Sequence, residues 1–165
     1  MLILTYITPG YIHWFRHLYI NIQLLNLQHF LHVCTSFTLP LPFENVTVLK
    51  QKYSDKAQSF GSKEYGKIVN NRHKCILKFY KITDILFLDT DVTLFRSPIP
   101  YLKQHDTGVP IFLDDSGPFR KAGTLNGGCI YLPQTTSTMN FIDFFVKHLK
   151  REKSRNDQDV LNKHK

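Results

Sequence analysis

Residues 85–92 read Ile-Leu-Phe-Leu-Asp-Thr-Asp-Val, four apolar residues followed by two aspartates one position apart. An apolar run of this length is typical of a central strand of a parallel sheet that is covered on both faces. Open α/β sheets bind ligands beyond the carboxyl ends of their strands. The segment therefore predicts that Asp89 and Asp91 lie at a binding site, although aspartate is also common in simple turns.

The rest of the chain alternates strand-like and helix-like segments. Apolar runs of strand length occur at 2–7, 29–34, 46–49, 109–113 and 127–132, and helical spacing covers 11–25, 64–81 and 139–149. The aromatic residues in the first helical segment, among them Tyr11 and Trp14, are interpreted as core packing. The alternation predicts an α/β fold with a mostly parallel sheet flanked by helices. Without internal repeats or a linker, residues 1–165 are expected to form a single domain.

Length and charge limit the possible functions. The chain has 165 residues with a net charge of +8, from 21 Lys and Arg against 13 Asp and Glu. This charge suits an anionic partner such as a phosphorylated metabolite, a membrane surface or a nucleic acid, or it only serves solubility. The basic cluster over 147–155 has no interleaved aromatic residues, so a solvated helix end is favoured and no nucleic acid is expected.

Cysteine and targeting patterns add further limits. Cys34, Cys75 and Cys129 lie far apart in apolar surroundings, which argues against a zinc site and favours buried thiols. Residues 45–47, Asn-Val-Thr, form a glycosylation sequon that permits a secretory location. The apolar run at the N-terminus is too short for a signal sequence or a membrane span. Attachment to a membrane is therefore expected only through an anchor absent from this chain.

The two aspartates at the strand end suggest metal chemistry. Neighbouring carboxylates repel one another unless a cation lies between them, and their hard oxygen atoms suit Mn²⁺ or Mg²⁺, which in turn can hold a diphosphate. One class with such a strand is the haloacid-dehalogenase-like phosphatases, whose Asp-x-Asp-x-Thr pattern fits residues 89–93. In that class the motif normally opens the chain, whereas here 88 residues precede it, and the later acidic motif is missing.

A second class matches more of the chain. Besides Asp-Thr-Asp, the sequence has Thr-Pro-Gly-Tyr at 8–11, Phe-Gly-Ser-Lys-Glu-Tyr-Gly at 60–66, Pro-Ile-Pro-Tyr-Leu at 98–102, Asn-Gly-Gly at 126–128 and Asp-Gln-Asp-Val-Leu-Asn at 157–162. In this order, the motifs resemble the nucleotide-diphospho-sugar transferase family of GT-A fold, which contains plant cell-wall xylosyl- and arabinosyltransferases. The resemblance covers almost the whole chain.

The resemblance implies roles for the donor-binding residues. Asp91 would bind Mn²⁺ directly, and Asp89 would contact the ribose or reach the metal through water. The other positions implied to contact the donor are Thr8, Gly10 and Tyr11 at the nucleotide, Arg72 at the diphosphate, and Asn126 and Gly127 at the sugar. An ordinary turn at 8–11 and a surface arginine at 72 are the alternatives. A bulge at the glycine pair is compatible with the assigned role.

The resemblance also implies catalytic and acceptor positions. Asp157 and Asp159 would reach the transferred sugar, where an anion stabilises an oxocarbenium-like transition state, and helix capping is their alternative role. Asp114 and Asp115 would border the acceptor, or belong to a simple loop. Related enzymes continue past this motif to a late histidine of the metal site, and His164 follows Asp159 too soon for that role. The chain is therefore expected to be a fragment, or its metal site to be incomplete.

The function implied is retaining transfer of a sugar from a UDP-linked donor to a hydroxyl of a glycan or glycoprotein. The implied cofactor is Mn²⁺ or Mg²⁺, and the implied location is the Golgi or the wider secretory pathway. The alternatives are a non-catalytic relative that keeps the fold and the phosphatase discussed above. Metal-dependent UDP binding would separate both transferase-like alternatives from the phosphatase.

Overall fold

The computed structural model describes residues 1–39, 44–49, 58, 62–114, 124–151 and 157–163. The strands are β1 (Leu2–Ile7), β2 (Leu31–Thr35), β3 (Val46–Val48), β4 (Ile85–Leu88), β5 (Ile111–Asp114) and β6 (Leu125–Leu132). The helices are α1 (Ile12–Leu24), α2 (Lys63–Tyr80), α3 (Ile99–Gln104), α4 (Thr136–Arg151) and α5 (Asp157–Lys163), with 3₁₀ turns η1 (Pro9–Tyr11) and η2 (Gln28–Phe30).

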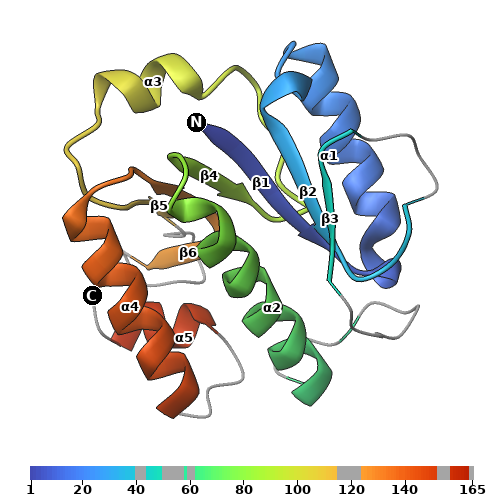
Figure 1. The fold of residues 1–165 in the computed structure, drawn as a ribbon. Coiled ribbons are helices and arrows are strands. Elements are labelled where there is room, and N and C mark those ends of the chain that lie inside the picture. Colours follow the sequence, from blue (N-terminus) through green and yellow to red (C-terminus); the bar gives the residue numbers. More distant parts are fainter. Residues whose placement is uncertain (40–43, 50–57, 59–61, 115–123, 152–156, 164–165) are drawn as a thin grey trace.

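The strands form one sheet in the order β3-β2-β1-β4-β6-β5 (Figure 1). Four of them, β3, β2, β1 and β4, run parallel to one another, while β6 is antiparallel to both β4 and β5. The predicted mostly parallel α/β sheet is therefore confirmed. Because antiparallel neighbours run in opposite directions, the carboxyl end of β4 lies beside the amino end of β6.

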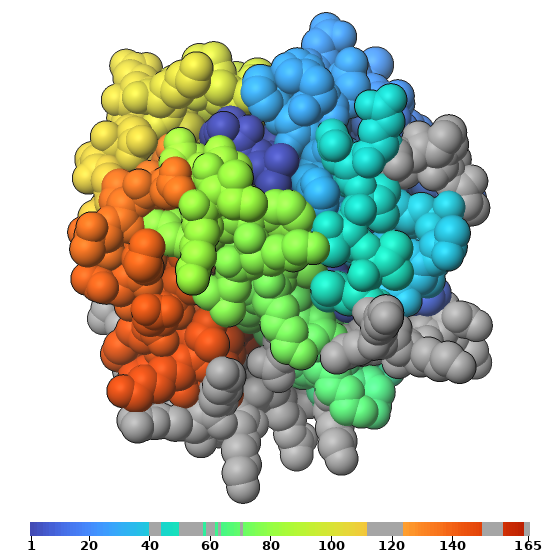
Figure 2. Space-filling model, viewed as in Figure 1, coloured from blue at the N-terminus to red at the C-terminus, as the bar shows by residue number. Residues whose placement is uncertain are grey.

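Helices cover both faces of this sheet. On one face, Phe15, Leu18 and Ile22 of α1 pack with Ile3 and Ile7 of β1. On the other face, α2 and α4 pack against the alternate side chains of the same strands, and Figure 2 shows α2 in the middle of this side, between α4 and the segment that holds β2 and β3. All four residues of β4 are buried, as expected for a strand covered on both faces.

Local sequence signals explain most element boundaries. Ser62 caps α2 by accepting a hydrogen bond of 3.1 Å from the backbone N–H of Tyr65. Pro9 occupies the first turn of η1, where a missing N–H costs nothing. The structure differs from the predicted ranges at several boundaries. Strands β2 and β5 begin two residues later than predicted, β6 begins at Leu125 rather than residue 127, and α4 begins three residues earlier than predicted. A short helix, α3, follows Pro98 where no element was predicted.

Candidate functional site

The carboxyl ends of β1 and β4 come together at one edge of the sheet. The two strands are parallel neighbours, with Leu4 opposite Phe87, so the residues that follow them emerge side by side. After β1 come Thr8 and Tyr11, and after β4 come Asp89 and Asp91. The structure thus places the strand-end aspartates at the end of a central strand, as the sequence predicts, and brings the 8–11 turn next to them.

A cavity of about 250 Å³ opens at this edge. Its lining includes Thr8, Tyr11, Trp14, Tyr65, Arg72, Asp89 and Asp91. Tyr11 and Trp14 therefore face the cavity. Trp14 is 45% exposed, so its interpretation as core packing is wrong, whereas Tyr11 lines the cavity and also packs against the core. Both residues lie at the start of the helical segment, whose later apolar residues enter the core. Helical periodicity does not show whether a side chain lies above the end of a strand or above the sheet itself.

The centre of the site is a buried arginine between two carboxylates. Arg72, on α2, is 6% exposed, so the alternative of a surface arginine is wrong. Its Nη1 donates to both oxygens of Asp89, at 2.7 and 2.9 Å, and its Nη2 donates to Oδ2 of Asp157. The guanidinium also lies over the ring of Phe87, 5.4 Å from the centroid. Two anions and an aromatic face thus compensate the cost of burying this cation.

Asp157 reaches this centre from the start of α5. It is 1% exposed, and its Oδ2 is also 3.0 Å from Nε2 of His73, the residue after Arg72. Helix α5 is held in place by Asn162, whose side chain bonds both the backbone N–H and the carbonyl of Leu125 on β6, at 2.8 and 3.0 Å. The final asparagine of the Asp-Gln-Asp-Val-Leu-Asn motif is therefore structural: it ties the helix that carries Asp157 to the strand beside Asp89.

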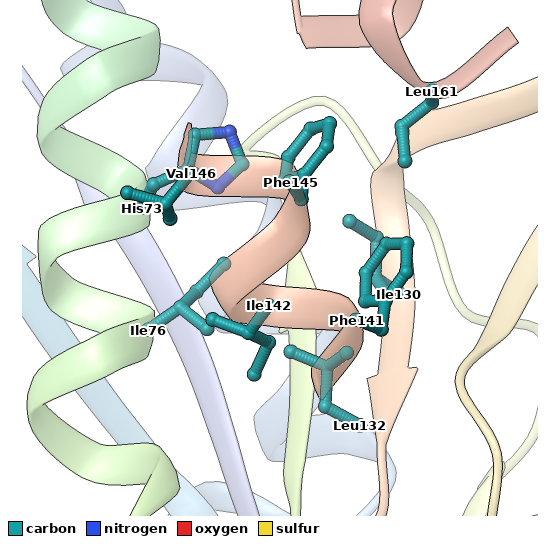
Figure 3. Close-up of a pocket in the computed structure, with 9 residues that line it drawn as sticks. All are labelled: His73, Ile76, Ile130, Leu132, Phe141, Ile142, Phe145, Val146 and Leu161. Carbon is teal, nitrogen blue, oxygen red and sulfur yellow. The ribbon is translucent and has the colours of Figure 1, made fainter. Parts of the chain in front are cut away.

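His73 supports the same carboxylate from the apolar side. Its ring meets Phe145 of α4 edge-on, with centroids 5.0 Å apart, and lines a small apolar cavity between α2, α4 and β6 (Figure 3). Burial lowers the pKa of His73, although the neighbouring carboxylate of Asp157 opposes this shift. At neutral pH the ring is uncharged, and its Nε2–H donates to Asp157. Nothing in the sequence marked this histidine except its position next to Arg72.

Two glycines let the strand backbone approach the charged groups. Gly128 accepts a hydrogen bond of 2.7 Å from the backbone N–H of Asp89, and a Cβ at Gly128 would lie only 2.7 Å from Oδ2 of the same aspartate. A Cβ at Gly127 would lie 3.1 Å from Nη2 of Arg72 and 3.2 Å from Oδ2 of Asp157. Asn126 accepts a 2.6 Å hydrogen bond from the N–H of Gly128. The antiparallel β6 therefore brings Asn126 and Gly127 to the aspartate side of the site.

The ion network sets the charges of its members. Burial by itself would raise the pKa of Asp157, but Arg72 and His73 together hold it well below its ordinary range. Burial raises the pKa of Asp89, and Arg72 offsets this only in part. Burial also raises the pKa of Tyr65 to about 12, so this phenol faces the cavity as a neutral hydroxyl. Asp157 is therefore held as an anion at neutral pH.

Several polar atoms at the cavity are ready to bind a ligand. Within the described ranges, the buried Thr8 Oγ1 and Arg72 Nε have no hydrogen-bond partner. Buried polar groups are normally paired, so unpaired atoms at a cavity indicate partners that a bound molecule would supply. Asp91 is exposed at the cavity and its carboxylate has no hydrogen bond or ion pair with the described residues. The cavity thus offers donors beside an exposed anion.

The donor chemistry of the strand end fits a hard divalent cation. Asp89 and Asp91 present carboxylate oxygens on the same loop, and Mg²⁺ and Mn²⁺ commonly take one or two carboxylates and complete their shell with water and phosphate oxygens. Among the described residues, no three His, Cys, Asp or Glu side chains form a group suited to bind a metal. Of the residues that line the cavity, Asp89 and Asp91 are the ones with carboxylates that could hold a cation.

Two predicted site residues, Asp159 and Gly10, do not line the cavity, and the side chains of two others lie outside the described residues. Asp159 is exposed on α5, and among the described residues nothing pairs with its carboxylate. Gly10 lies in η1 between two residues that line the cavity, but does not line it itself. The backbone of Asp114 ends β5, while its side chain and the whole of Asp115 lie outside the described part of the chain, as does the Phe-Gly pair at 60–61.

Comparison with known protein families decides the affiliation. The family model for nucleotide-diphospho-sugar transferases matches residues 19–165. The chain belongs to the nucleotide-diphospho-sugar transferase family. The match covers the strand-end aspartates, the glycine pair and the buried carboxylate of α5, and it excludes the phosphatase alternative. A search of curated proteins found no match.

Solved structures show that this nucleotide-diphospho-sugar transferase shares its fold with glycosyltransferases. A glycosyltransferase involved in glycosylation of the major capsid of PBCV-1 superposes with a TM-score of 0.59 at 10% identity, over 99% of this chain and 74% of that one. Galactosyltransferase LgtC, solved with donor and acceptor sugar analogues, gives a TM-score of 0.60 at 14% identity, over 98% and 69%. Among its described helices, none is both long and apolar enough to cross a bilayer.

Proposed function

We propose that residues 1–165 form a single domain that transfers a sugar from a UDP-linked donor to an acceptor hydroxyl, with a divalent cation and with retention of the anomeric configuration. The observation that carries this proposal is the buried Arg72 bridge between Asp89 and Asp157 at a cavity beyond the ends of β1 and β4. A nucleotide-diphospho-sugar needs a cationic group for its diphosphate and an anion near its sugar carbon, and this centre holds both.

The nucleotide is assigned to the β1 side of the cavity. Tyr11 and Trp14 offer aromatic surface to a base or ribose, and Trp14 is 45% exposed in the cavity wall. Thr8 offers its unpaired hydroxyl there. Gly10 lies in η1 between Thr8 and Tyr11 and is assigned to the same end of the donor. These residues bind and orient the donor without touching the bond that breaks.

The diphosphate is assigned to the strand-end aspartates and Arg72. Asp91 and Asp89 would hold Mn²⁺ or Mg²⁺, and a cation in that position neutralises charge that develops on a leaving diphosphate. Arg72 is the fixed positive group next to them, and its unpaired Nε is an available donor. Because both oxygens of Asp89 already accept from Nη1 of Arg72, Asp91 is the aspartate with freer access to a cation.

The sugar is assigned to the side of the site where Asn126, Gly127 and the buried Asp157 lie next to Arg72 and Asp89. Arg72 and His73 keep Asp157 ionised, so it presents a fixed negative charge where positive charge builds in an oxocarbenium-like transition state. Asp159 lies two residues further on the same helix and is exposed, so it is assigned to the acceptor side together with the region of Asp114 and Asp115. The acceptor is a glycan or glycoprotein hydroxyl in the Golgi or secretory pathway.

Titration of UDP, with and without Mn²⁺, tests the nucleotide and metal roles. We expect metal-dependent binding, and Asp91→Asn is expected to abolish that dependence because an amide keeps the shape but removes the charge that holds the cation. Asp143→Asn, an exposed carboxylate on α4, is the matched control and should bind like the unaltered protein. Metal-dependent binding that survives Asp91→Asn would show the metal role to be wrong.

A second candidate function is nucleotide-sugar binding without turnover. It is favoured by the occupation of both Asp89 oxygens by Arg72 and by the lack of a third ligand among the described residues. Turnover of a UDP-sugar separates the two. In the catalytic case Asp159→Asn should lower transfer while leaving UDP affinity unchanged, because an acceptor-side group acts on the reaction more than on donor binding.

A further inference from the structure

The glycosylation sequon lies outside the lining of the cavity. Residues 45–47, Asn-Val-Thr, are the one Asn-x-Ser/Thr triplet in the 165-residue sequence. Asn45 immediately precedes β3, and its carbonyl accepts a hydrogen bond of 2.9 Å from the backbone N–H of Val33 on β2. This bond fixes the backbone of Asn45 at the beginning of the strand pair, while its side chain is exposed.

The side chain of Asn45 has no structural task within the described residues. Its carboxamide makes no hydrogen bond there, whereas Thr47 Oγ1 lies 3.0 Å from Nε2 of His32 on β2. The amide nitrogen is therefore available to carry a large polar substituent. A substituent at this nitrogen displaces no contact that the fold uses, because it extends from an exposed position into solvent.

The sheet topology separates Asn45 from the cavity. Strand β3 is the outermost strand of the parallel half and runs in the same direction as β2, β1 and β4 (Figure 1). Val46 pairs with Val33, which pairs with Thr5 of β1, so Asn45 is level with Leu4. The three residues from Leu4 to the carboxyl end of β1 span about 10 Å, and β2 lies between β3 and β1, which adds about 10 Å across the sheet. Asn45 is therefore displaced from the cavity both along and across the sheet, and it does not line the cavity.

We propose that Asn45 is N-glycosylated. In the reaction, the Nδ2 atom of Asn45 attacks the anomeric carbon of an oligosaccharide that is linked to a lipid diphosphate. A C–N bond forms, the C–O bond to phosphate breaks, and the lipid diphosphate leaves with the electron pair while Asn45 gives up one proton. The proposal rests on the secretory location in the proposed function, and it is independent of whether the cavity catalyses transfer.

The structure also constrains when this modification occurs. In the folded protein, Thr47 lies in β3 with its hydroxyl next to His32, so the sequon is held as part of the strand pair. Transfer therefore precedes the pairing of β3 with β2. Once in place, the glycan projects from the strand that ends the sheet, and bulky polar groups at an edge strand prevent pairing with other chains. The expected benefit is resistance to edge-to-edge association.

The test directs the whole chain into the secretory lumen of cultured cells with a cleavable signal peptide. Treatment with peptide N-glycosidase is expected to shift the product by the mass of one oligosaccharide and to convert Asn45 to aspartate, which peptide mass spectrometry detects. Asn45→Gln and Thr47→Val should each abolish the shift. Thr47→Ser, which keeps the hydroxyl, is the matched control and should retain it. The protein isolated from its own cells is mapped in the same way.

The outcomes separate this inference from the proposed activity. Unmodified Asn45 in the lumen-directed chain would overturn the inference, since the sequon would then fail where the donor is present. Modification in the directed chain, but not in the natural protein, would also overturn it and would show that the assigned location is wrong. UDP binding measured on the unaltered protein and on Asn45→Gln should be equal, because Asn45 does not line the cavity.

Discussion

The parallel and antiparallel halves of the sheet contribute different kinds of group to the cavity. The parallel half supplies side chains that face a ligand: Thr8 and Tyr11 after β1, and Asp89 and Asp91 after β4. The antiparallel half supplies the glycine pair of β6, together with the buried Asp157 of α5. The parallel half therefore presents accessible groups to a ligand, whereas the antiparallel half packs against these groups and supplies a buried counter-charge for Arg72.

This difference shows how a buried arginine is made tolerable at a binding site. Arg72 comes from α2, between the two halves, and it pairs with one carboxylate from each. Asp89 keeps 36% of its side chain exposed, whereas the side chain of Asp157 is only 2% exposed. The comparison implies that changes in the antiparallel half act mainly on stability, and changes in the parallel half act mainly on ligand binding.

The largest effect is expected from removing the shared cation. Arg72→Met should lower the free energy of unfolding by about 3–5 kcal/mol, because it leaves Asp157 buried without its charge partner. Denaturant titration measures this. Arg96→Met, an exposed arginine, should change stability by no more than about 0.5 kcal/mol. Combining Arg72→Met with Asp157→Asn should recover part of the loss. Wild-type stability for Arg72→Met alone would refute the buried pair.

A smaller effect is expected where β6 passes the aspartate loop. Gly128→Ala places a Cβ 2.7 Å from Oδ2 of Asp89, so the loop must move, at a cost of about 1–3 kcal/mol, and UDP affinity should fall. Gly127→Ala is the graded control: its contacts with Arg72 and Asp157 begin at 3.1 Å, so its cost should be smaller. Equal unfolding free energies and UDP affinities for both variants would contradict the close approach at Gly128.

The buried histidine predicts a pH dependence of stability. The pKa of His73 is lowered below its ordinary 6.5, so the unfolded chain binds a proton that the folded chain does not. Its contribution is therefore fully present at pH above about 6.5 and is lost as pH falls below that value. The melting temperatures of the wild type and of His73→Gln are measured as a function of pH. The difference between them should become smaller as the pH falls below about 6.5.

Among the described histidines, His32 also has a pKa that burial lowers, so His32→Gln serves as the comparison variant. It lies in the strand pair of the parallel half, away from Asp157. Both substitutions should reduce the fall in melting temperature at acidic pH. Only His73→Gln should also weaken donor binding at neutral pH. An unchanged fall in melting temperature at acidic pH in His73→Gln would mean that this ring is not held neutral in the folded chain.

The smallest effect is expected in the loop that follows Asp91. The side chain of Asn21, on α1, bonds both the backbone N–H and the carbonyl of Leu94, each at 2.7 Å. Asn21→Ala should cost about 1–2 kcal/mol and weaken Mn²⁺-dependent UDP binding severalfold, because this loop carries a proposed metal ligand. Gln23→Ala on the same helix is the control, since Gln23 bonds only Tyr19 at the surface. If Asn21→Ala and Gln23→Ala bind UDP equally well, the hydrogen bonds between Asn21 and Leu94 do not contribute to metal-dependent binding.

Local patterns in the sequence were enough to predict much of the fold. The apolar run before Asp89 identified the central strand, since four consecutive buried side chains occur where a strand is covered on both faces. Helical spacing located α2 and α4. The ordered motifs also indicated the family. These features depend on near neighbours in the chain, which is why a single sequence reveals them.

The tertiary structure alone decided which candidate residues meet. Asp157 and Asp159 look equivalent in sequence, but successive residues of a helix rotate by about 100°, so two positions apart they point to nearly opposite sides. Asp157 consequently meets Arg72, while Asp159 faces solvent. The antiparallel direction of β6, which brings Gly128 beside Asp89, and the contact of His73 with Asp157 join residues 39 and 84 positions apart. Such contacts follow from how helices and strands pack, and no local pattern encodes that packing.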